Sequence, residues 1–210
     1  MADKKRLRFL VGIVTGDTVF AEFALSLRMM KFPENSQVLF AMNKANGVDV
    51  ARNMVVESAP SDTDYILFLN DDVLVPADAV ERLMARGKDI VSGLYFSASP
   101  PFYPHLYKSD GKGKYDNVPD YAKNSLVEVD AVRAGALLVR KKVFDKIGAP
   151  FFQHAVQKND LPEDFFFCRK AKEAGFQVFC DTSVVCTHMG VSMVNEKAWE
   201  SMKDQVKRKD

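Results

Sequence analysis

The sequence predicts an α/β sandwich built around a largely parallel central sheet. Short apolar runs alternate with segments of helical spacing over the first half of the chain, and the second half is mixed. The run Tyr65–Leu69 is continuously apolar, as expected for a strand buried on both faces of a sheet. The length of 210 residues suits one compact domain, or one domain with a small appendage.

The other elements follow from periodicity and from Pro and Gly at segment ends. Further strands are expected over residues 7–15, 37–42, 89–96, 126–132, 136–140 and 176–179. Helices are expected over residues 19–30, 49–59, 76–87, 141–148, 161–175 and 195–210. The stretch 97–125 is rich in Pro and Gly, which predicts a long functional or mobile loop.

Two of the expected helices carry an apolar stripe that predicts burial. In the first helix the stripe comprises Val19, Phe20, Phe23, Leu27 and Met30. In the last helix it comprises Trp199, Met202 and Val206, and we expect it to pack on the parent domain rather than on a membrane or a partner.

Composition excludes several classes of protein. Hydrophobic residues make up 47% of the chain and aromatic residues 11%, which excludes a disordered protein. The 29 Lys and Arg residues nearly balance 28 Asp and Glu residues, so the net charge of +1 gives no support to a nucleic-acid binder. The oligomeric state is not indicated.

Cysteine usage and hydropathy predict a cytoplasmic protein. The odd number of cysteines, with no CxxC pair, argues against a disulfide framework, and Cys168 and Cys180 are expected to be core residues of a reduced compartment. No apolar run approaches the ~20 residues of a membrane-spanning helix. The basic and then apolar N-terminus is interpreted as a first strand rather than a signal peptide.

Polar residues follow the buried strand directly, as Asn70, Asp71 and Asp72. Two adjacent carboxylates at the carboxyl edge of a strand are costly unless a cation joins them, and this edge binds ligands in open α/β sheets. Mg²⁺ is typically held by one or two carboxylates and substrate phosphates. The stretch therefore indicates a metal–diphosphate site, although exposed turn residues that cap the next helix explain it equally well.

Four segments taken together, in order, carry a resemblance to a known family. They are NGVDVARNMVVESA, YILFLNDDVLVPADAVERLM, DIVSGLYF with the Pro-rich stretch after it, and the segment from VDAVRAGALLVR through LPEDFFFCRKAKEAGFQVFCDTSVVCTHMG. The chain resembles the nucleotide-diphospho-sugar glycosyltransferases of the GT-A fold, particularly the family 2-like group.

The resemblance implies an organisation for the chain. We expect a GT-A-type three-layer α/β/α sandwich with a mostly parallel sheet, as a single catalytic domain over residues 1–190. Its nucleotide-binding half would span about 1–96 and its acceptor half about 126–190, followed by a C-terminal amphipathic helix over 191–210.

The same resemblance implies a metal site for Mn²⁺ or Mg²⁺. Asn70, Asp71 and Asp72 occupy the DxD-like motif, with Asp72 in the metal-binding position and Asn70 in place of the first acid. His188 matches the histidine that often completes this site, whereas taken alone it would be interpreted as a core or surface residue. Cys186 lacks the second Cys/His pair that a zinc site requires.

Glu163 and Asp164 match the family's ED motif, and Asp164 takes the place of the catalytic base of inverting members. The chemistry needs a carboxylate that removes the proton of the acceptor hydroxyl as it attacks the anomeric carbon. Both acids also suit the first turn of a helix, where the helix dipole favours anions, and both roles can hold together.

On the nucleotide side, the resemblance places Arg52, Asn53, Thr15 and Asp17 at the donor. Arg52 and Asn53 match a segment that borders the nucleotide site, although a solvated helix arginine is the alternative for Arg52. Thr15 and Asp17 lie where the end of the first strand usually meets the base. The acid that many members carry after strand two is missing from AMNKAN, so the base stays open.

On the acceptor side, the turn over residues 133–136 begins with Arg133, and its small residues would let a sugar approach the backbone. His105 and Tyr107 in the Pro-rich stretch are either sugar-pocket residues or surface-loop residues.

The expected function is a metal-dependent, hexosyltransferase-type glycosyltransferase (EC 2.4). It would move a sugar from a nucleotide-diphosphate-sugar donor to a carbohydrate or other hydroxyl acceptor, with inversion. One alternative is a sugar nucleotidyltransferase. Such an enzyme requires a Gly-rich phosphate-binding loop after the first strand, and the sequence there, TGDTVFAEF, does not contain one. The other is a non-catalytic module that binds nucleotide sugars or carbohydrates.

Overall fold

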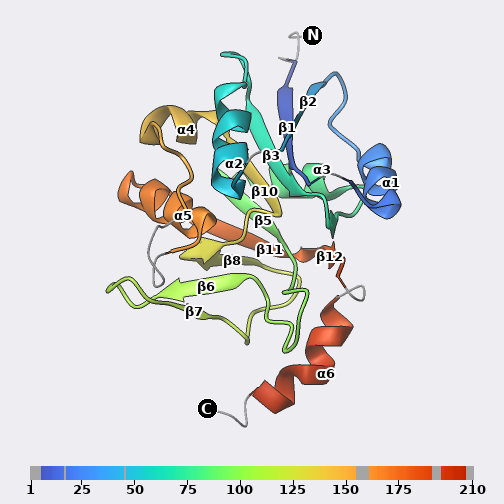
Figure 1. Ribbon diagram of the computed structural model, residues 1–210, viewed down its shortest axis with the longest axis vertical. Helices are drawn as coiled ribbons and strands as arrows, with labels where there is room; N and C mark the ends of the chain where they lie inside the picture. The colour runs from blue at the N-terminus through green and yellow to red at the C-terminus, as the bar shows by residue number, and fades with distance from the viewer. Residues whose placement is uncertain (1–5, 17, 45, 155–160, 191–194, 207–210) are drawn as a thin grey trace.

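A seven-stranded sheet runs through the middle of the molecule (Figure 1). The computed structural model describes residues 6–16, 18–44, 46–154, 161–190 and 195–206. The strands stand in the order β2-β1-β3-β10-β5-β11-β8. Their bounds are β1 Arg8–Val14, β2 Gln37–Asn43, β3 Tyr65–Asn70, β5 Ile90–Leu94, β8 Leu126–Val129, β10 Ala136–Arg140 and β11 Val178–Val185.

Most strands of this sheet point the same way, which confirms the expected architecture. Strand β1 pairs in parallel with both β2 and β3, and β11 pairs in parallel with β5. Strand β10 is inserted antiparallel between β3 and β5, and β8 pairs antiparallel with β11 at the edge. The carboxyl ends of β1, β3 and β5 therefore meet at one edge of the sheet.

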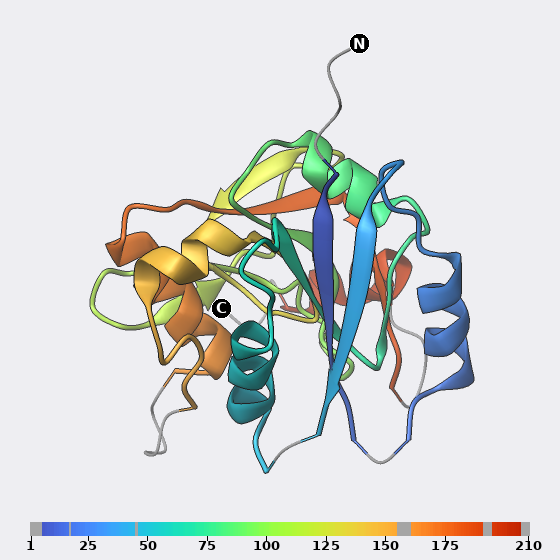
Figure 2. The same cartoon turned by 90° about the horizontal axis from the view of Figure 1, so that it is seen from above.

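Helices cover both faces of the sheet, so the molecule has three layers (Figures 1 and 2). The helices are α1 Ala21–Met29, α2 Val48–Glu57, α3 Ala79–Ala85, α4 Lys141–Ile147, α5 Glu163–Glu173 and α6 Glu196–Val206. In β3, Ile66 and Phe68 pack in the core beneath α2, α4 and α5, whereas Leu67 and Leu69 pack in the core beneath α1 and α3. Alternate side chains of one fully apolar strand thus build both cores.

Two small sheets lie outside the main one, and they correct the sequence interpretation. One joins β4 (Val73–Leu74) to β12 (Thr187–His188). The other has the order β7-β6-β9, with β6 Leu106–Ser109, β7 Tyr115–Asn117 and β9 Ala131–Val132. The stretch 97–125 therefore contains a hairpin rather than only a loop. The strand expected over 126–132 is two strands in different sheets.

The apolar stripes are only partly as expected. Val19 and Phe20 precede α1 and are exposed, whereas Phe23 is buried, because α1 begins at Ala21 and is short. Trp199 of α6 is buried against Phe96, as expected for a helix that packs on its own chain. The side chain of Val206 lies outside the described residues.

Two further expectations can be compared with the structure. All three cysteines are buried and free, which confirms the prediction for Cys168 and Cys180. In the described ranges, no helix has the length and apolar character that crossing a membrane requires.

Close contact between α2 and the sheet depends on Gly12. A Cβ on this residue would lie 2.3 Å from Cγ1 of Val55, which is far inside van der Waals contact. A glycine in the middle of β1 therefore lets α2 approach the sheet closely. This approach sets the depth at which α2 carries Arg52.

An ion pair between partly exposed Arg86 and buried Asp181 joins the end of α3 to β11. The fully buried carboxylate of Asp181 accepts hydrogen bonds from Nε and Nη2 of Arg86 at 2.7 and 3.0 Å, and from the Ser183 hydroxyl at 2.6 Å. Burial alone would raise the pKa of Asp181, but these donors hold the pKa below its ordinary value.

We therefore expect Asp181→Asn to destabilise the protein in a pH-dependent way. A lowered native pKa stabilises the fold above the unfolded pKa of about 3.9, and this contribution is lost as the pH falls through the native pKa. The variant should lower the free energy of unfolding by about 1–3 kcal/mol at pH 7. Urea denaturation followed by Trp199 fluorescence should show the difference from wild type shrinking below about pH 4.

Asp145→Asn, on the exposed side of α4, is the matched control and should change stability little at any pH. If Asp181→Asn lowered the free energy of unfolding by the same amount at pH 7 and at pH 3, the result would contradict a stabilising role for the ionised, paired carboxylate.

Candidate functional site

Two adjoining cavities open at the carboxyl ends of the parallel strands. The larger has a volume of about 420 Å³ and the smaller about 290 Å³. Val48, Asn70 and Asp72 line both, so the cavities meet at the polar end of β3. This is the edge at which open α/β sheets bind ligands.

The smaller cavity lies between the ends of β1 and β3. It is lined by Thr15, Gly16 and Asp71 as well as by the shared residues. The backbone N–H of Gly16 donates to Oδ2 of Asp71 at 3.2 Å, which ties the two strand ends together. Asp17, which the resemblance placed with Thr15, lies outside the described residues.

Asp72 and His188 meet between the two cavities although they are 116 residues apart in sequence. Nε2 of His188 lies 3.2 Å from Oδ2 of Asp72. Pairing of β12 with β4 sets this contact, and the N–H of Met189 donates to the carbonyl of Asp72 at 2.7 Å. The structure thus brings together two residues that the resemblance assigned to one site.

The hydrogen bonds of His188 indicate which of its nitrogens carries a proton when the ring is neutral. Its Nδ1 lies 2.6 Å from the carbonyl oxygen of Phe96, which can only accept, so Nδ1 carries the proton of a neutral imidazole. The Nε2 lone pair then faces a carboxylate oxygen. Two acceptors this close require a cation between them, either a second proton on His188 or a metal ion.

The local chemistry is compatible with either cation. Burial lowers the pKa of His188, but hydrogen bonds to Asp72 and Phe96 raise it above its ordinary value overall. Oδ1 of Asp72 is buried and has no hydrogen-bond partner among the described residues. A carboxylate oxygen and an imidazole nitrogen are ligands that suit Mn²⁺, and a carboxylate oxygen suits Mg²⁺.

Further protein ligands do not gather around this pair. Within the described ranges, no group of three or more His, Cys, Asp or Glu side chains is placed to hold a metal ion. A cation at Asp72 and His188 would therefore depend on phosphate oxygens and water for its remaining ligands, which is how Mg²⁺ is usually held.

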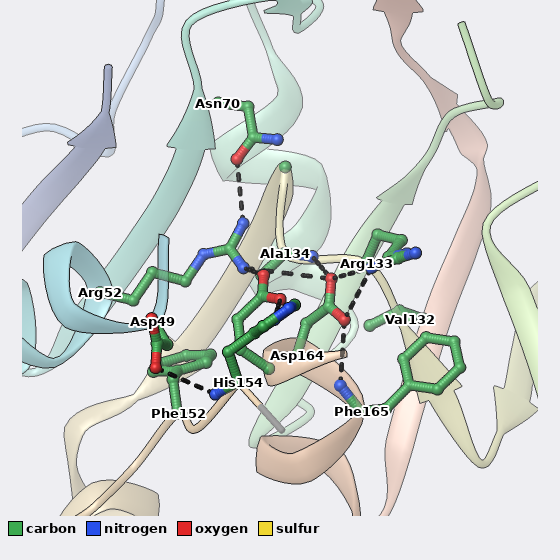
Figure 3. A network of polar contacts seen from close by, with 12 residues as sticks. Asp49, Arg52, Asn70, Val132, Arg133, Ala134, Phe152, His154, Asp164 and Phe165 are labelled. Carbon is green, nitrogen blue, oxygen red and sulfur yellow. Dashed lines mark hydrogen bonds and ion pairs between the residues drawn. The ribbon is translucent and has the colours of Figure 1, made fainter. Parts of the chain in front are cut away.

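Arg52 of α2 is buried and lines the larger cavity, and Figure 3 shows its guanidinium directed toward Asn70. Its Nη1 pairs with Glu163 of α5, and its Nη2 donates to Oδ1 of Asn70 at 3.0 Å. It is therefore neither a solvated helix arginine nor a free group at the cavity mouth. It connects α2, β3 and α5.

Asp164 lies beside this pair, with 2% of its surface exposed. It accepts backbone hydrogen bonds from Ala134 at 3.3 Å and Phe165 at 3.0 Å, and Nη1 of Arg133 lies 3.3 Å from its Oδ1 (Figure 3). Burial raises the pKa of Asp164 above its ordinary value, and the positive charge of Arg133 only partly offsets this effect.

Asn53 has a different surrounding from the one expected. Its side-chain amide donates to the carbonyl of Phe152 at 2.7 Å and accepts from the N–H groups of Phe151 and Phe152 at 2.9 and 3.1 Å. It does not line either of the two cavities described above. Its polar atoms hold the segment before α5 against α2.

Tyr95 is a cavity residue that sequence reasoning missed. Its buried hydroxyl accepts the N–H of Gly135 at 2.9 Å, and a Cβ on Gly135 would lie only 2.7 Å from that oxygen. Burial holds the pKa of Tyr95 well above its ordinary value, so the phenol keeps its proton. Within an apolar strand segment, a tyrosine gives no sequence signal for this position.

His105 lines the larger cavity, which favours the sugar-pocket alternative over the surface-loop alternative. Its Nδ1 lies 2.9 Å from the hydroxyl of Tyr107. Burial is the main cause that lowers the pKa of His105 to about 3, and the nearby Arg133 and His188 add to it. This imidazole is therefore neutral at pH 7.

Comparisons with known proteins support the fold. No family model matches the sequence, and no curated protein matches it. Among solved structures, A197 from STIV has a TM-score of 0.60 and 20% identity, with 88% of this chain and 86% of that chain covered.

Two larger proteins are similar to the chain over only part of their own length. GalNAc-T7, solved with UDP, GalNAc and Mn²⁺, has a TM-score of 0.65 and 13% identity, with 90% of this chain and 45% of that chain covered. TarS of S. aureus, residues 1–349 with UDP-GlcNAc, has a TM-score of 0.56 and 14% identity, with 85% and 57% covered. The chain thus has a fold similar to that of GT-A glycosyltransferases, and spans about half the length of these two chains.

We expect the buried pair Arg52–Glu163 to be strongly coupled energetically. Arg52→Met or Glu163→Met alone should lower the free energy of unfolding by about 3–5 kcal/mol, because each removes the main counter-charge of a buried charged group. The double variant should cost less than the sum by about 2–3 kcal/mol, measured by urea denaturation.

The exposed pair Lys141–Asp145 on α4 gives the matched cycle, with an expected coupling of about 0.3–0.5 kcal/mol. Equal coupling energies in the two cycles would show that the pair does not organise the site.

Proposed function

We propose that this protein is a metal-dependent glycosyltransferase that moves a sugar from a nucleotide-diphosphate-sugar to a hydroxyl acceptor. The observation that carries the proposal is the contact between Asp72 and His188, where Nε2 of the imidazole and a carboxylate oxygen lie 3.2 Å apart in the wall of the larger cavity. The GT-A-like fold agrees with it, as does GalNAc-T7, which was solved with UDP and Mn²⁺.

The two cavities suggest how a donor would lie. The smaller one, with Thr15 and Asp71, would take the nucleoside. Asp72 and His188 would hold Mn²⁺ or Mg²⁺ next to the diphosphate. When bound, this cation offsets the negative charge that develops on the departing diphosphate. The sugar and the acceptor would then occupy the larger cavity.

Asp164 is proposed as the general base. The acceptor oxygen forms a bond to the anomeric carbon as the bond from that carbon to the diphosphate oxygen breaks. The bonding electron pair leaves with the diphosphate, and the acceptor proton moves to Asp164. Burial favours this role because a raised pKa makes the carboxylate a stronger base.

Glu163 is proposed to act with Asp164 by holding the site rather than by proton transfer. Its carboxylate is paired with Arg52, and Nδ1 of His154 lies 3.6 Å from its other oxygen. Arg52 in turn holds Asn70, which stands at the meeting point of the cavities. We propose that Glu163 and Arg52 fix the position of Asp164 relative to Asn70 at the donor side of the site.

The first experiment is thermal unfolding with nucleoside diphosphates and their hexose conjugates, each with and without Mn²⁺. A ligand that binds only the native state raises the melting temperature. At a concentration of 100 times Kd it increases the free energy of unfolding by about 2.7 kcal/mol. The nucleotides of one nucleobase should raise the melting temperature only when Mn²⁺ is present. Asp72→Asn should lose this shift, because it removes a charged ligand of the proposed metal site.

Asp145→Asn removes an exposed carboxylate instead and should keep the shift. The donor site would be ruled out if no nucleotide stabilised the wild-type protein at millimolar concentration, or if Asp72→Asn responded as wild type does.

For the proposed base, we expect Asp164→Asn to lower the transfer rate about 10²–10⁴-fold with little change in donor affinity. The amide keeps the shape of the side chain but does not accept the acceptor proton. Release of nucleoside diphosphate from the donor found above, with and without monosaccharide acceptors, measures the rate, and calorimetry measures donor affinity.

Asp145→Asn again serves as control and should retain full activity. A large loss of donor affinity in Asp164→Asn, or transfer at the wild-type rate, would remove Asp164 from the role of base.

A further inference from the structure

Arg133 is a cation that the proposed reaction does not yet use. It lies in the turn between β9 and β10, lines the larger cavity, and has 34% of its side chain exposed. Figure 3 shows it beside Asp164, on the opposite side of that carboxylate from Arg52. Arg133 is thus partly exposed, whereas the guanidinium of Arg52 is buried and paired with Glu163.

The guanidinium of Arg133 lies over the ring of Phe165. Its central carbon lies 5.2 Å from the ring centre of Phe165, within the range of a cation–π contact. Phe165 packs in turn on Tyr107 and Tyr115, with ring centres 4.6 and 4.9 Å apart. A planar cation fixed in this way loses little conformational entropy when it binds a ligand.

Asp164 uses only part of the hydrogen-bonding capacity of Arg133. Both of its contacts involve Nη1, at 3.3 Å to Oδ1 and 3.5 Å to Oδ2, and both are long for a charge-assisted bond. A guanidinium carries five N–H donors in a planar fork that suits carboxylate and phosphate groups. The side chain lines the larger cavity with 34% of its surface exposed, and the hydroxyl of Tyr107 is its other hydrogen-bond partner.

Proton transfer to Asp164 changes the charge that Arg133 faces. Before the transfer, Arg52 and Arg133 are balanced by Glu163 and Asp164. Once Asp164 is neutral, Arg133 keeps its charge at a partly buried position and has lost its counter-charge, which is unfavourable. A negative group on the acceptor would replace it.

We propose that the acceptor carries an oxyanion, a carboxylate or a phosphate monoester, close to its reacting hydroxyl, and that Arg133 binds this group. The inference rests on the proposed function, because the acceptor is defined by the hydroxyl that Asp164 deprotonates. It makes Arg133 the residue that selects acidic over neutral sugars.

Calorimetry with matched acceptor probes tests the inference in the protein saturated with UDP and Mn²⁺, or with the base that the thermal assay identifies. Galacturonate is compared with its neutral methyl ester, and glucose 6-phosphate with glucose, at 0.15 M ionic strength. We expect one acidic probe to bind at least tenfold more tightly than its neutral partner. The arm that shows the preference identifies the carboxylate or the phosphate as the anion.

Arg133→Gln should abolish this preference, whereas Arg133→Lys should keep part of it because it retains the charge. Arg169→Gln, which removes an exposed arginine of α5, should keep all of it. The preference is a ratio of two affinities in one variant, so a general loss of stability does not move it.

Equal affinity of the wild-type protein for acidic and neutral probes would overturn the inference. So would a preference that survives in Arg133→Gln, or inorganic phosphate that binds as tightly as glucose 6-phosphate. If no nucleotide binds, the proposed function fails on its own. The same titrations on the protein without nucleotide then show whether Arg133 still binds an anion.

Discussion

The buried contact between Arg52 and Glu163 is the interaction on which the site depends. Arg52 also holds Asn70, so one guanidinium joins α2, the end of β3 and the start of α5. Without this charge, two adjacent buried carboxylates at the start of α5 would face each other at high electrostatic cost. The depth of Arg52 follows in turn from Gly12, whose missing Cβ lets α2 lie close against the sheet.

The second constraint is the meeting of Asp72 with His188. It is produced by a short β-pairing between residues just after β3 and residues near the C-terminal end of the described fold. Neither strand belongs to the main sheet, although Val73 of β4 packs in the core beneath α1 and α3. A short peripheral pairing thus assembles the proposed metal-binding contact, and under the proposed function it would couple donor binding to the docking of the segment around β12.

Local patterns predicted much of this structure, and long-range pairing explains what they missed. The run Tyr65–Leu69 was identified as a doubly buried strand because every residue in it is apolar. The strand expected over 126–132 was wrong because Asp130 separates two strands that pair with different sheets. The family resemblance, rather than local pattern, assigned Asp72, Asp164 and His188 to one site, and all three line the larger cavity. Tyr95 depends on a backbone contact with Gly135 that no residue pattern reveals.

Asn70, the departure from the DxD pattern, is understandable from the charges around it. Its amide oxygen accepts from Arg52, whose positive charge is already balanced by Glu163 and lies 4.0 Å from Asp164. An aspartate here would add a third carboxylate to one buried cation, with a desolvation cost and no further counter-charge. The neutral amide makes the same hydrogen bond without that cost. In the proposed function, Asp72 and His188 are then the residues that would bind the cation, and the acids of α5 would face the acceptor.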